Sequence, residues 1–219
     1  MAYGFLDIAT TPSVRAARAE MGSARLWETA GQDRDFDRLS GNEIAFIAAR
    51  DSFYMASVSE AGWPYVQHRG GPPGFLKVID DKTLAFADFS GNRQYLSLGN
   101  LKADDRVALI LMDYAHKARL KLYAHAEVVA VDADPALRER VLDAGYRARP
   151  ERLIKLRLEA FDWNCPQHIT PRYTYTEISE AMAPLREQLA ALEAENAELR
   201  ARLLRAGQGV DDEGAPHGQ

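Results

Sequence analysis

The sequence predicts a mainly β protein with flanking helices, whose strands form a closed or split barrel. Four short segments rich in strand-forming residues follow one another between residues 52 and 87. The segment 119–131 (RLKLYAHAEVVAV) then alternates polar with apolar side chains, as a strand with one buried face does. Few helical segments interrupt these strands, and evenly spaced strands of this kind are typical of barrels.

Length, composition and charge fit a globular protein. The 219 residues suit one domain of about 150 to 180 residues with an appendage. Hydrophobic residues make up 47% of the chain and charged residues 27%, which is ordinary for such a domain. The net charge of -5 argues against broad binding to nucleic acids or anionic membranes, so we expect neither as a partner.

A cytoplasmic location is the default expectation for this chain. No apolar run approaches the roughly 20 residues that span a bilayer. The first residues lack the basic start and apolar core of a secretory signal. The single cysteine, Cys165, cannot form an intrachain disulfide, in agreement with a reducing compartment.

Residues 1–50 are expected to form a helical segment packed on the barrel. Thr11-Pro12 is typical of an N-cap followed by proline at the first helical position, and predicts a helix that ends at Gly22. Ser40 and Glu43 have the spacing of a capping box, which predicts a second helix that ends near Arg50.

Residues 51–178 are expected to form the barrel, beginning with two hairpins. The first joins 52–59 to 63–69 through a turn that contains Gly62. The second joins Phe75–Ile79 to Thr83–Ala87 through an acidic turn. A turn-rich Asp88–Gly91 then opens a helix expected to run from near Asn92 to Ala103.

Three strands and one helix complete the predicted barrel. Residues 106–112 are almost all apolar, which predicts a strand buried on both sides. In the long strand that follows, alternate residues from Leu120 to Val128 are expected to share one face. Residues 135–148 are expected to form a helix with Leu137, Val141 and Tyr146 buried. The alternating segment 153–161 is expected to close the sheet.

The C-terminal region, 180–206, predicts a coiled-coil helix. Leucines alternate at spacings of four and three, with Leu185, Leu192 and Leu199 at heptad position d, and Leu189, Asn196 and Leu203 at position a. A single asparagine at position a favours a parallel two-stranded coil. An amphipathic helix packed on its own domain is the alternative. The polar, glycine-rich 207–219 is expected to be disordered.

One stretch of the predicted barrel is a candidate anion receptor. The second hairpin leads into a helix N-terminus, where free amides and the helix dipole attract anions, and Arg93 adds a permanent cation. Upstream, Arg69 precedes Gly70 and Gly71, whose bare backbone lets a flat ligand approach closely. A plain helix cap would explain Asn92 and Arg93 equally. We predict a site for a phosphate-tailed cofactor.

The order of these segments resembles the pyridoxamine 5'-phosphate oxidase superfamily. The matching residues are Arg69, Phe75–Val78, Leu84–Asp88, Ser90–Arg93, Asn100 and Arg106–Leu109. Members of that superfamily fold as an FMN-binding split β-barrel, and the resemblance, which spans Thr11 to Ile178, implies this fold and an FMN cofactor. It also implies a homodimer with two flavin sites between the subunits.

The resemblance further implies which residues contact the cofactor. Those expected from the hairpin and the helix start are Arg69, Gly70, Lys77, Ala87, Asp88, Asn92, Arg93 and Gln94. Lys117 and Arg119 are expected to approach the cofactor of the partner subunit, although surface charge at a turn explains them equally. Trp163, Gln167 and His168 are expected to cap the flavin ring.

The segment 162–169 (DWNCPQHI) resembles one found in uncharacterised split-barrel flavoproteins, where it implies a wall of the flavin pocket. A well-packed loop is the alternative. His168 is the only catalytic candidate, as a proton donor beside the flavin, but a loop histidine also serves as a local hydrogen-bonding group. Cys165 is expected to be a packed side chain. No histidine or cysteine spacing predicts a metal site.

The sequence departs from true pyridoxamine 5'-phosphate oxidases at its C-terminus. Those enzymes hold the substrate phosphate with a tryptophan and paired arginines, and here DWNCPQHITPRY and the heptad segment replace them. A vitamin B6 substrate is therefore not predicted. We expect an FMN-dependent oxidoreductase that acts on an unidentified small molecule, with NADH or NADPH as a candidate electron donor. The alternative is a non-catalytic flavin or haem binding or sensing module with a coiled-coil docking helix.

Overall fold

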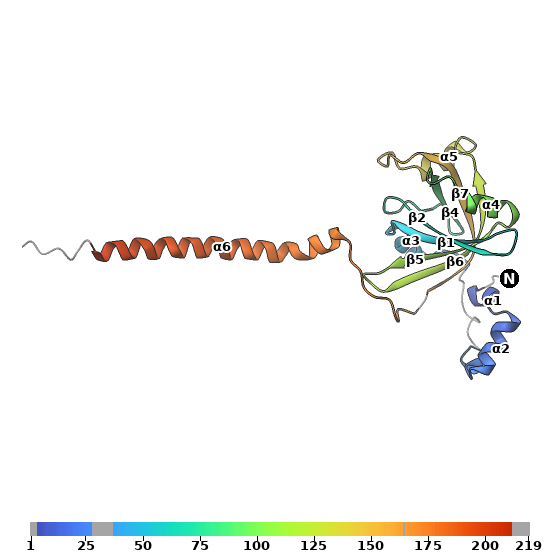
Figure 1. Cartoon of the computed structure of the whole chain (residues 1–219), viewed down its shortest axis with the longest axis horizontal. Helices are drawn as coiled ribbons and strands as arrows, with labels where there is room; N and C mark the ends of the chain where they lie inside the picture. The colour runs from blue at the N-terminus through green and yellow to red at the C-terminus, as the bar shows by residue number, and fades with distance from the viewer. Residues whose placement is uncertain (1–3, 28–36, 164, 212–219) are drawn as a thin grey trace, which may run out of the picture. The chain divides into compact units, whose positions relative to one another are not determined.

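The computed structural model describes residues 4–27, 37–163 and 165–211 (Figure 1). The chain divides into two units, Met1–Pro171 and Arg172–Gln219. The first unit contains a seven-stranded antiparallel sheet with short helices, and the second contains one long helix, α6 (Tyr175–Asp211). No helix of the described ranges combines the length and apolar character needed to cross a bilayer.

The sheet runs in the spatial order β2-β1-β5-β6-β7-β4-β3. Its strands are β1 (Ser52–Val58), β2 (Pro64–Gly70), β3 (Lys77–Val78), β4 (Thr83–Phe89), β5 (Arg106–Asp113), β6 (Ala118–Val129) and β7 (Pro150–Trp163). The two edge strands, β2 and β3, are not paired with each other within the described residues. The sheet curls around a core without closing, so the prediction of a mainly β split barrel is confirmed (Figure 1).

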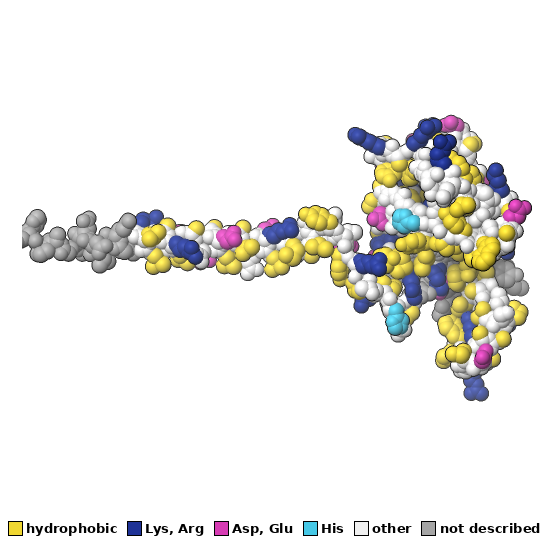
Figure 2. All heavy atoms as spheres, viewed as in Figure 1, with side chains coloured by type: hydrophobic (Ala, Val, Ile, Leu, Met, Phe, Trp, Pro, Cys, Tyr) yellow, Lys and Arg dark blue, Asp and Glu magenta, His cyan; other side chains and the backbone are white. Residues whose placement is uncertain are grey.

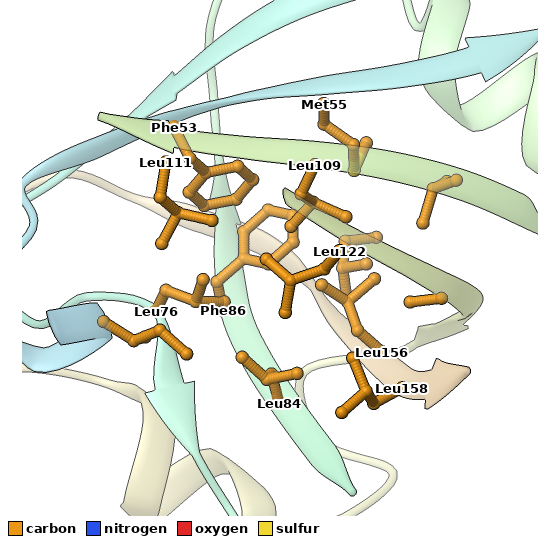
Figure 3. Close-up of a cluster of buried hydrophobic side chains, with 14 of the residues drawn as sticks. Phe53, Met55, Leu76, Leu84, Phe86, Leu109, Leu111, Leu122, Leu156 and Leu158 are labelled. Carbon is orange, nitrogen blue, oxygen red and sulfur yellow. The ribbon is translucent and has the colours of Figure 1, made fainter. Parts of the chain in front are cut away.

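The core lies inside the curled sheet and draws alternate residues from β1, β4, β5, β6 and β7 (Figure 3). Phe53 of β1 stacks on Phe75 with ring centroids 5.4 Å apart and meets Phe86 of β4 edge-on at 5.2 Å. Leu111 and Leu122, from β5 and β6, are almost completely buried beside them. Burying each such side chain contributes about 1.5–3 kcal/mol, which makes this cluster the main source of stability.

Strand β4 is buried on both faces, since Leu84 and Phe86 face the core while Ala85 and Ala87 face a second, smaller cluster. Helix α5 (Pro135–Val141) covers that second face with Leu137 and Val141. The other helices of this unit are α1 (Phe5–Ala9), α2 (Pro12–Glu20), α3 (Gly41–Ala48) and α4 (Leu96–Ala103), with a 3-10 turn at Ala24–Trp27. Thr11 caps α2 and the Ser40–Glu43 capping box opens α3, as predicted.

The β2–β3 connection depends on one glycine. Gly74 has φ +74°, and a Cβ at this position would lie 2.9 Å from the carbonyl oxygen of Ala48. Its amide donates to the carbonyl of Arg50 at 2.8 Å. At Gly71 the space beside the backbone is filled by Phe75, since a Cβ would lie 2.7 Å from its ring. The backbone of Gly71, where a flat ligand was expected to approach, is therefore covered by Phe75 of the same chain.

Several predicted boundaries were wrong. The helix expected from Asn92 begins at Leu96, because Arg93 (φ 60°) and Tyr95 (φ 55°) are left-handed and cannot continue a helix. The strand expected over Phe75–Ile79 is limited to Lys77–Val78. The helix expected over 135–148 ends at Val141, which leaves Tyr146 41% exposed on a turn against Phe89.

Two patterns of burial also differ from expectation. β5 alternates between buried and half-buried residues instead of being buried on both sides, because only one of its faces meets the core. Val128, expected to share the buried face of β6, is 39% exposed. Helix α6 continues to Asp211, so residues 207–211 of the segment expected to be disordered are helical, while 212–219 lie outside the described residues.

Candidate functional site

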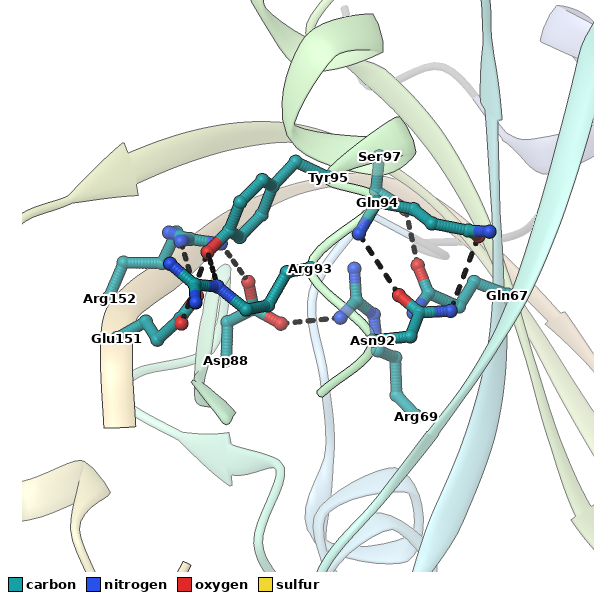
Figure 4. A network of polar contacts seen from close by, with 10 residues as sticks. All are labelled: Gln67, Arg69, Asp88, Asn92, Arg93, Gln94, Tyr95, Ser97, Glu151 and Arg152. Atoms are coloured by element: carbon teal, nitrogen blue, oxygen red, sulfur yellow. Dashed lines mark hydrogen bonds and ion pairs between the residues drawn. The ribbon is translucent and has the colours of Figure 1, made fainter. Parts of the chain in front are cut away.

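A polar cavity lies where β2, β4, β7 and the start of α4 meet (Figure 4). Its volume is about 190 Å³, smaller than the ~300–1,000 Å³ typical of small-molecule sites, so it has room for part of a ligand. Gln67 and Arg69 are two residues apart on β2 and therefore share its inner face. The cavity is lined by Tyr65, Gln67, Arg69, Asp88, Phe89, residues 91–98, Glu151 and Arg152.

Asp88 is the centre of the charge network in this cavity. One of its carboxylate oxygens accepts a hydrogen bond from Arg69, and the other lies 2.7 Å from Nη1 of Arg152. All three side chains are at most 14% exposed. Since each oxygen of Asp88 holds one guanidinium, the carboxylate fixes both arginines at the cavity. The Arg69–Asp88 pair also joins β2 to β4 across the split in the barrel.

The register of the sheet brings Asp88 and Arg152 together. Strand β4 pairs with β7, and Asp88 stands directly opposite Arg152. The register shifts between Asp88 and Phe89, which is an irregularity of the kind that re-aims side chains near sites. Glu151 extends the network, because its Oε2 lies 2.6 Å from Nη2 of Arg152.

The loop between β4 and α4 places a third arginine at the cavity mouth. Arg93 is exposed, and its Nε reaches the hydroxyl of Tyr95 at 3.5 Å. That hydrogen bond, the charge of Tyr95 and the nearby Glu151 raise the pKa of Arg93 above its ordinary value, so the guanidinium stays charged. Asn92 accepts a hydrogen bond from the amide of Gln94 at 3.1 Å, which holds the turn.

Helix α4 is tied to the neighbouring strands by side-chain hydrogen bonds. Ser97 Oγ donates to Oε1 of Gln67 at 2.9 Å, and Asn100 Nδ2 donates to Oγ of Ser57 at 2.9 Å. Ser57 and Ser97 are both buried. These bonds fix the helix start, and with it the wall of the cavity that faces Arg69.

Two buried side-chain nitrogens lack a hydrogen-bond partner within the described residues: Nε of Arg69 and Nε of Arg119. A buried N–H without a partner costs about 1–3 kcal/mol, so such a group points to an unseen ligand or to water. Arg69 lines the cavity, where its guanidinium is otherwise held by Asp88. Both arginines are among the residues expected to contact a cofactor.

The structure brings together five of the predicted cofactor residues: Arg69, Asp88, Asn92, Arg93 and Gln94 all line the cavity. Gly70 follows Arg69 on β2 but does not line it. Lys77 lies on β3 opposite Ala85, and Ala87 points into the cluster with α5, so neither side chain reaches the cavity of the same chain.

The remaining predicted residues lie away from this cavity in the same chain. Lys117 is exposed in the β5–β6 turn, and Arg119 follows on β6. Gln167 and His168 are exposed after β7, and His168 has φ 62°. Cys165 is exposed, so the expectation of a packed thiol was wrong. Within the described residues no cluster of histidine, cysteine and carboxylate side chains forms a metal site.

Trp163 is held by Glu43 at the other end of β7. Its Nε1 donates to Oε1 of Glu43 at 2.6 Å, and Phe46 packs edge-on against the indole at 4.8 Å. Burial alone would raise the pKa of Glu43, but hydrogen bonds from Ser40 and Trp163 outweigh it and lower the pKa below 4.5. This carboxylate therefore anchors helix α3 to β7.

The Glu43 anchor predicts a pH dependence of stability. Because the pKa of Glu43 is lower in the folded state, its ionised form stabilises the fold. This stabilisation is complete above pH 4.5 and is lost as the pH falls through the folded-state pKa. We expect the Glu43→Gln variant to be less stable than wild type at neutral pH, with the difference shrinking below pH 4.5. Urea unfolding at neutral pH and below pH 4.5 measures this difference in the free energy of unfolding. The substitution Glu60→Gln, at an exposed position, is the control. A difference that does not change with pH would contradict the expectation.

Ten of the lining residues were not among the predicted site residues. Those whose side chains take part in the polar network are Gln67, Tyr95, Ser97, Glu151 and Arg152. Gln67 carried a usable signal, because it stands two residues before Arg69 on a predicted strand. Arg152 and Glu151 carried none, since only the pairing of β7 with β4 brings them to Asp88.

Comparison with known proteins identifies the family. Residues 42–164, more than half of the 219, match the sequence model of the family described as pyridoxamine 5'-phosphate oxidase. This range includes the whole cavity, from Tyr65 to Arg152. No curated protein matches the chain.

Solved structures similar to the chain are distant in sequence. HupZ of Group A Streptococcus has 14% identity and a TM-score of 0.47, over 62% of this chain and 100% of that one. A protein of Clostridium acetobutylicum related to general stress protein 26 has 15% identity and a TM-score of 0.42, over 61% and 92%. An FMN-binding protein of Syntrophomonas wolfei has 17% identity and a TM-score of 0.41, over 70% and 95%. The assignment rests on the family match: the chain belongs to the pyridoxamine 5'-phosphate oxidase family.

Proposed function

We propose that the protein is an FMN-dependent oxidoreductase acting on a small molecule, with the cavity around Arg69 as the site for the phosphate end of the cofactor. The observation that carries this proposal is the buried, unpartnered Nε of Arg69 in a cavity rimmed by Arg93. A phosphate oxygen is a strong acceptor for such a donor, and a charge-assisted bond of this kind is stronger than a neutral one.

The charges of the cavity suit a phosphate. Three arginines, at positions 69, 93 and 152, stand against two carboxylates, Asp88 and Glu151, which leaves an excess positive charge. The backbone N–H groups of Gly91 and Asn92 make no hydrogen bond within the described residues, so they are available as further donors. Asp88 holds Arg69 and Arg152 in place before a ligand arrives, which lowers the ordering cost of binding.

A bound flavin would supply the electron and hydride chemistry, while the chain supplies position, charge and exclusion of water. The cavity of about 190 Å³ holds only the phosphate end, so a second chain is needed to enclose the ring. We include in the proposal that Lys117, Arg119, Trp163, Gln167 and His168 of a second copy complete the site. The unpartnered Nε of Arg119 supports this role.

An apolar outer face of the sheet supports the proposed homodimer. Tyr54 of β1 stands beside Ile110 of β5, and Ala56 stands between Val66 of β2 and Ala108 of β5. Tyr54 is 39% exposed and Val66 59%, which leaves apolar surface that a second copy would bury.

The experiment that tests the cofactor is the visible absorption spectrum of the purified full-length protein, before and after adding FMN. We expect the two visible bands of an oxidised flavin, with FMN identified by chromatography of the released cofactor. A protein that neither contains nor takes up FMN would overturn the proposal. Rapid bleaching by NADH or NADPH, followed by turnover with an acceptor, supports an enzyme, whereas a bound flavin that stays inert supports a binding module.

Replacing Arg93 tests the rim of the site. We expect Arg93→Ala to weaken FMN binding about tenfold, since one charged hydrogen bond to the phosphate is lost. Isothermal titration calorimetry with FMN gives the affinity, and riboflavin, which lacks the phosphate, is the matched control ligand. Arg93→Ala should leave riboflavin affinity unchanged. Equal FMN affinity of the variant and wild type removes Arg93 from the site.

A further inference from the structure

Helix α6 exposes a continuous apolar seam that is longer than the sequence pattern first indicated. The helix begins at Tyr175, which adds Ile178 and Met182 to the heptad pattern at positions d and a. The seam side chains are between 41% and 71% exposed, and Figure 2 shows apolar side chains along the length of the helix. The apolar members are Ile178, Met182, Leu185, Leu189, Leu192, Leu199 and Leu203.

We propose that α6 pairs with α6 of a second copy of this chain, as a parallel two-stranded coiled coil in register. The seam from Ile178 to Leu203 repeats at four and three residues without interruption, the period that keeps a stripe facing a partner helix. At a rise of about 1.5 Å per residue it extends for about 39 Å. Pro184 lies at position c, outside the seam.

Asn196 selects the parallel arrangement. It is the one polar residue in the seam, at position a. In a parallel coil in register, the two Asn196 side chains face each other and can exchange hydrogen bonds. In an antiparallel coil, position a faces position d, so Asn196 would be buried against Leu192 of the partner subunit without a hydrogen-bonding partner, at a cost of about 1–3 kcal/mol for each amide.

The flanking charges select the same arrangement. In a parallel coil, position g faces position e five residues later, which pairs Glu195 with Arg200 of the partner subunit, twice by symmetry. Neither side chain makes an ion pair within the described part of its own chain, so both are free for this contact. The antiparallel register places Glu193 and Glu195 each opposite its own copy, and Arg186 opposite Arg200 of the partner subunit. Every charged pair in this register then brings like charges together, and Arg202 stands opposite the uncharged Gln188 of the partner subunit.

Cysteine cross-linking of the full chain tests orientation and register. In a Cys165→Ser background, Leu185→Cys, Leu203→Cys and Ala194→Cys place single thiols at positions d, a and f. A parallel coil in register cross-links Leu185→Cys to itself and Leu203→Cys to itself under mild oxidation. With ~10 μM protein and an effective concentration near ~1 mM, this is on the order of 100-fold faster than random collision. Ala194→Cys faces away from the seam and is the matched control.

Each other cross-linking pattern overturns the proposal. In an antiparallel coil, the Leu185→Cys variant would not cross-link to itself. It would cross-link to the Leu203→Cys variant when the two chains are coexpressed. A helix that does not pair would give all three variants the rate of Ala194→Cys. The readout requires no flavin, so the proposed coil and the proposed cofactor can fail independently.

Discussion

Replacing Asp88 by asparagine is expected to lower the free energy of unfolding by about 3–5 kcal/mol, the scale for removing one partner of a buried ion pair. Asp88 is 8% exposed and neutralises two arginines. Arg152 keeps its contact with Glu151, whereas Arg69 loses the only carboxylate that it contacts in the described structure. Urea unfolding followed by circular dichroism measures the change.

An exposed ion pair between two loops provides the control. Asp81 contacts Arg38 at 2.7 Å, but both side chains are about half exposed. Solvent screens such a pair, so Asp81→Asn should change the free energy of unfolding by at most about 1 kcal/mol. Equal effects of the two substitutions would show that Asp88 contributes no more than a surface charge.

Replacing Arg69 by methionine is expected to weaken FMN binding by about 1.5–3 kcal/mol, the scale for losing a hydrogen bond to a charged group. Methionine keeps an apolar side chain beside Phe86, over which the guanidinium carbon of Arg69 lies at 5.9 Å, while Asp88 remains paired with Arg152. The variant should therefore stay folded and lose mainly the buried donor. Titration calorimetry gives the affinity, and a thermal melt without FMN reports the fold.

A neighbour on the opposite face of β2 is the matched control for Arg69. His68 is exposed and packs against Tyr54, away from the cavity. His68→Ala should bind FMN as wild type does. Arg69→Lys separates charge from geometry, because lysine keeps the cation but not the planar fork. Wild-type affinity in Arg69→Met would refute the phosphate assignment.

The parts of the fold that could be predicted are those encoded locally. The hairpin of β1 and β2 follows from alternation of apolar residues around a turn at Gly62, and the starts of α2 and α3 follow from capping residues. The start of α4 could not be placed, because Arg93 and Tyr95 adopt left-handed conformations although neither is glycine, the residue that usually marks such a position. The faces of β5 were misjudged because Ala108, Ile110 and Met112 are apolar yet lie outside the core.

The candidate site, like the fold, could be predicted only in part. Arg69 and Arg93 were found because they lie in the segment that carries the family resemblance. Arg152 was missed because an arginine near the start of a strand is ordinary, and only its place opposite Asp88 gives it a role. The unpartnered Nε of Arg69 is likewise a property of packing and could not be read from the sequence.

The pairing of β4 with β7 has a consequence for the order of folding. Arg152 lies 64 residues after Asp88, so the last strand of the sheet must be made and docked before the charge network can form. Contacts this far apart in the chain carry a large loop-closure cost and form late. During synthesis the hairpin of β1 and β2 can form first, whereas Asp88 has no contact with Arg152 until β7 has been made and docked. We therefore expect ligand-binding competence to appear only with the final step of folding.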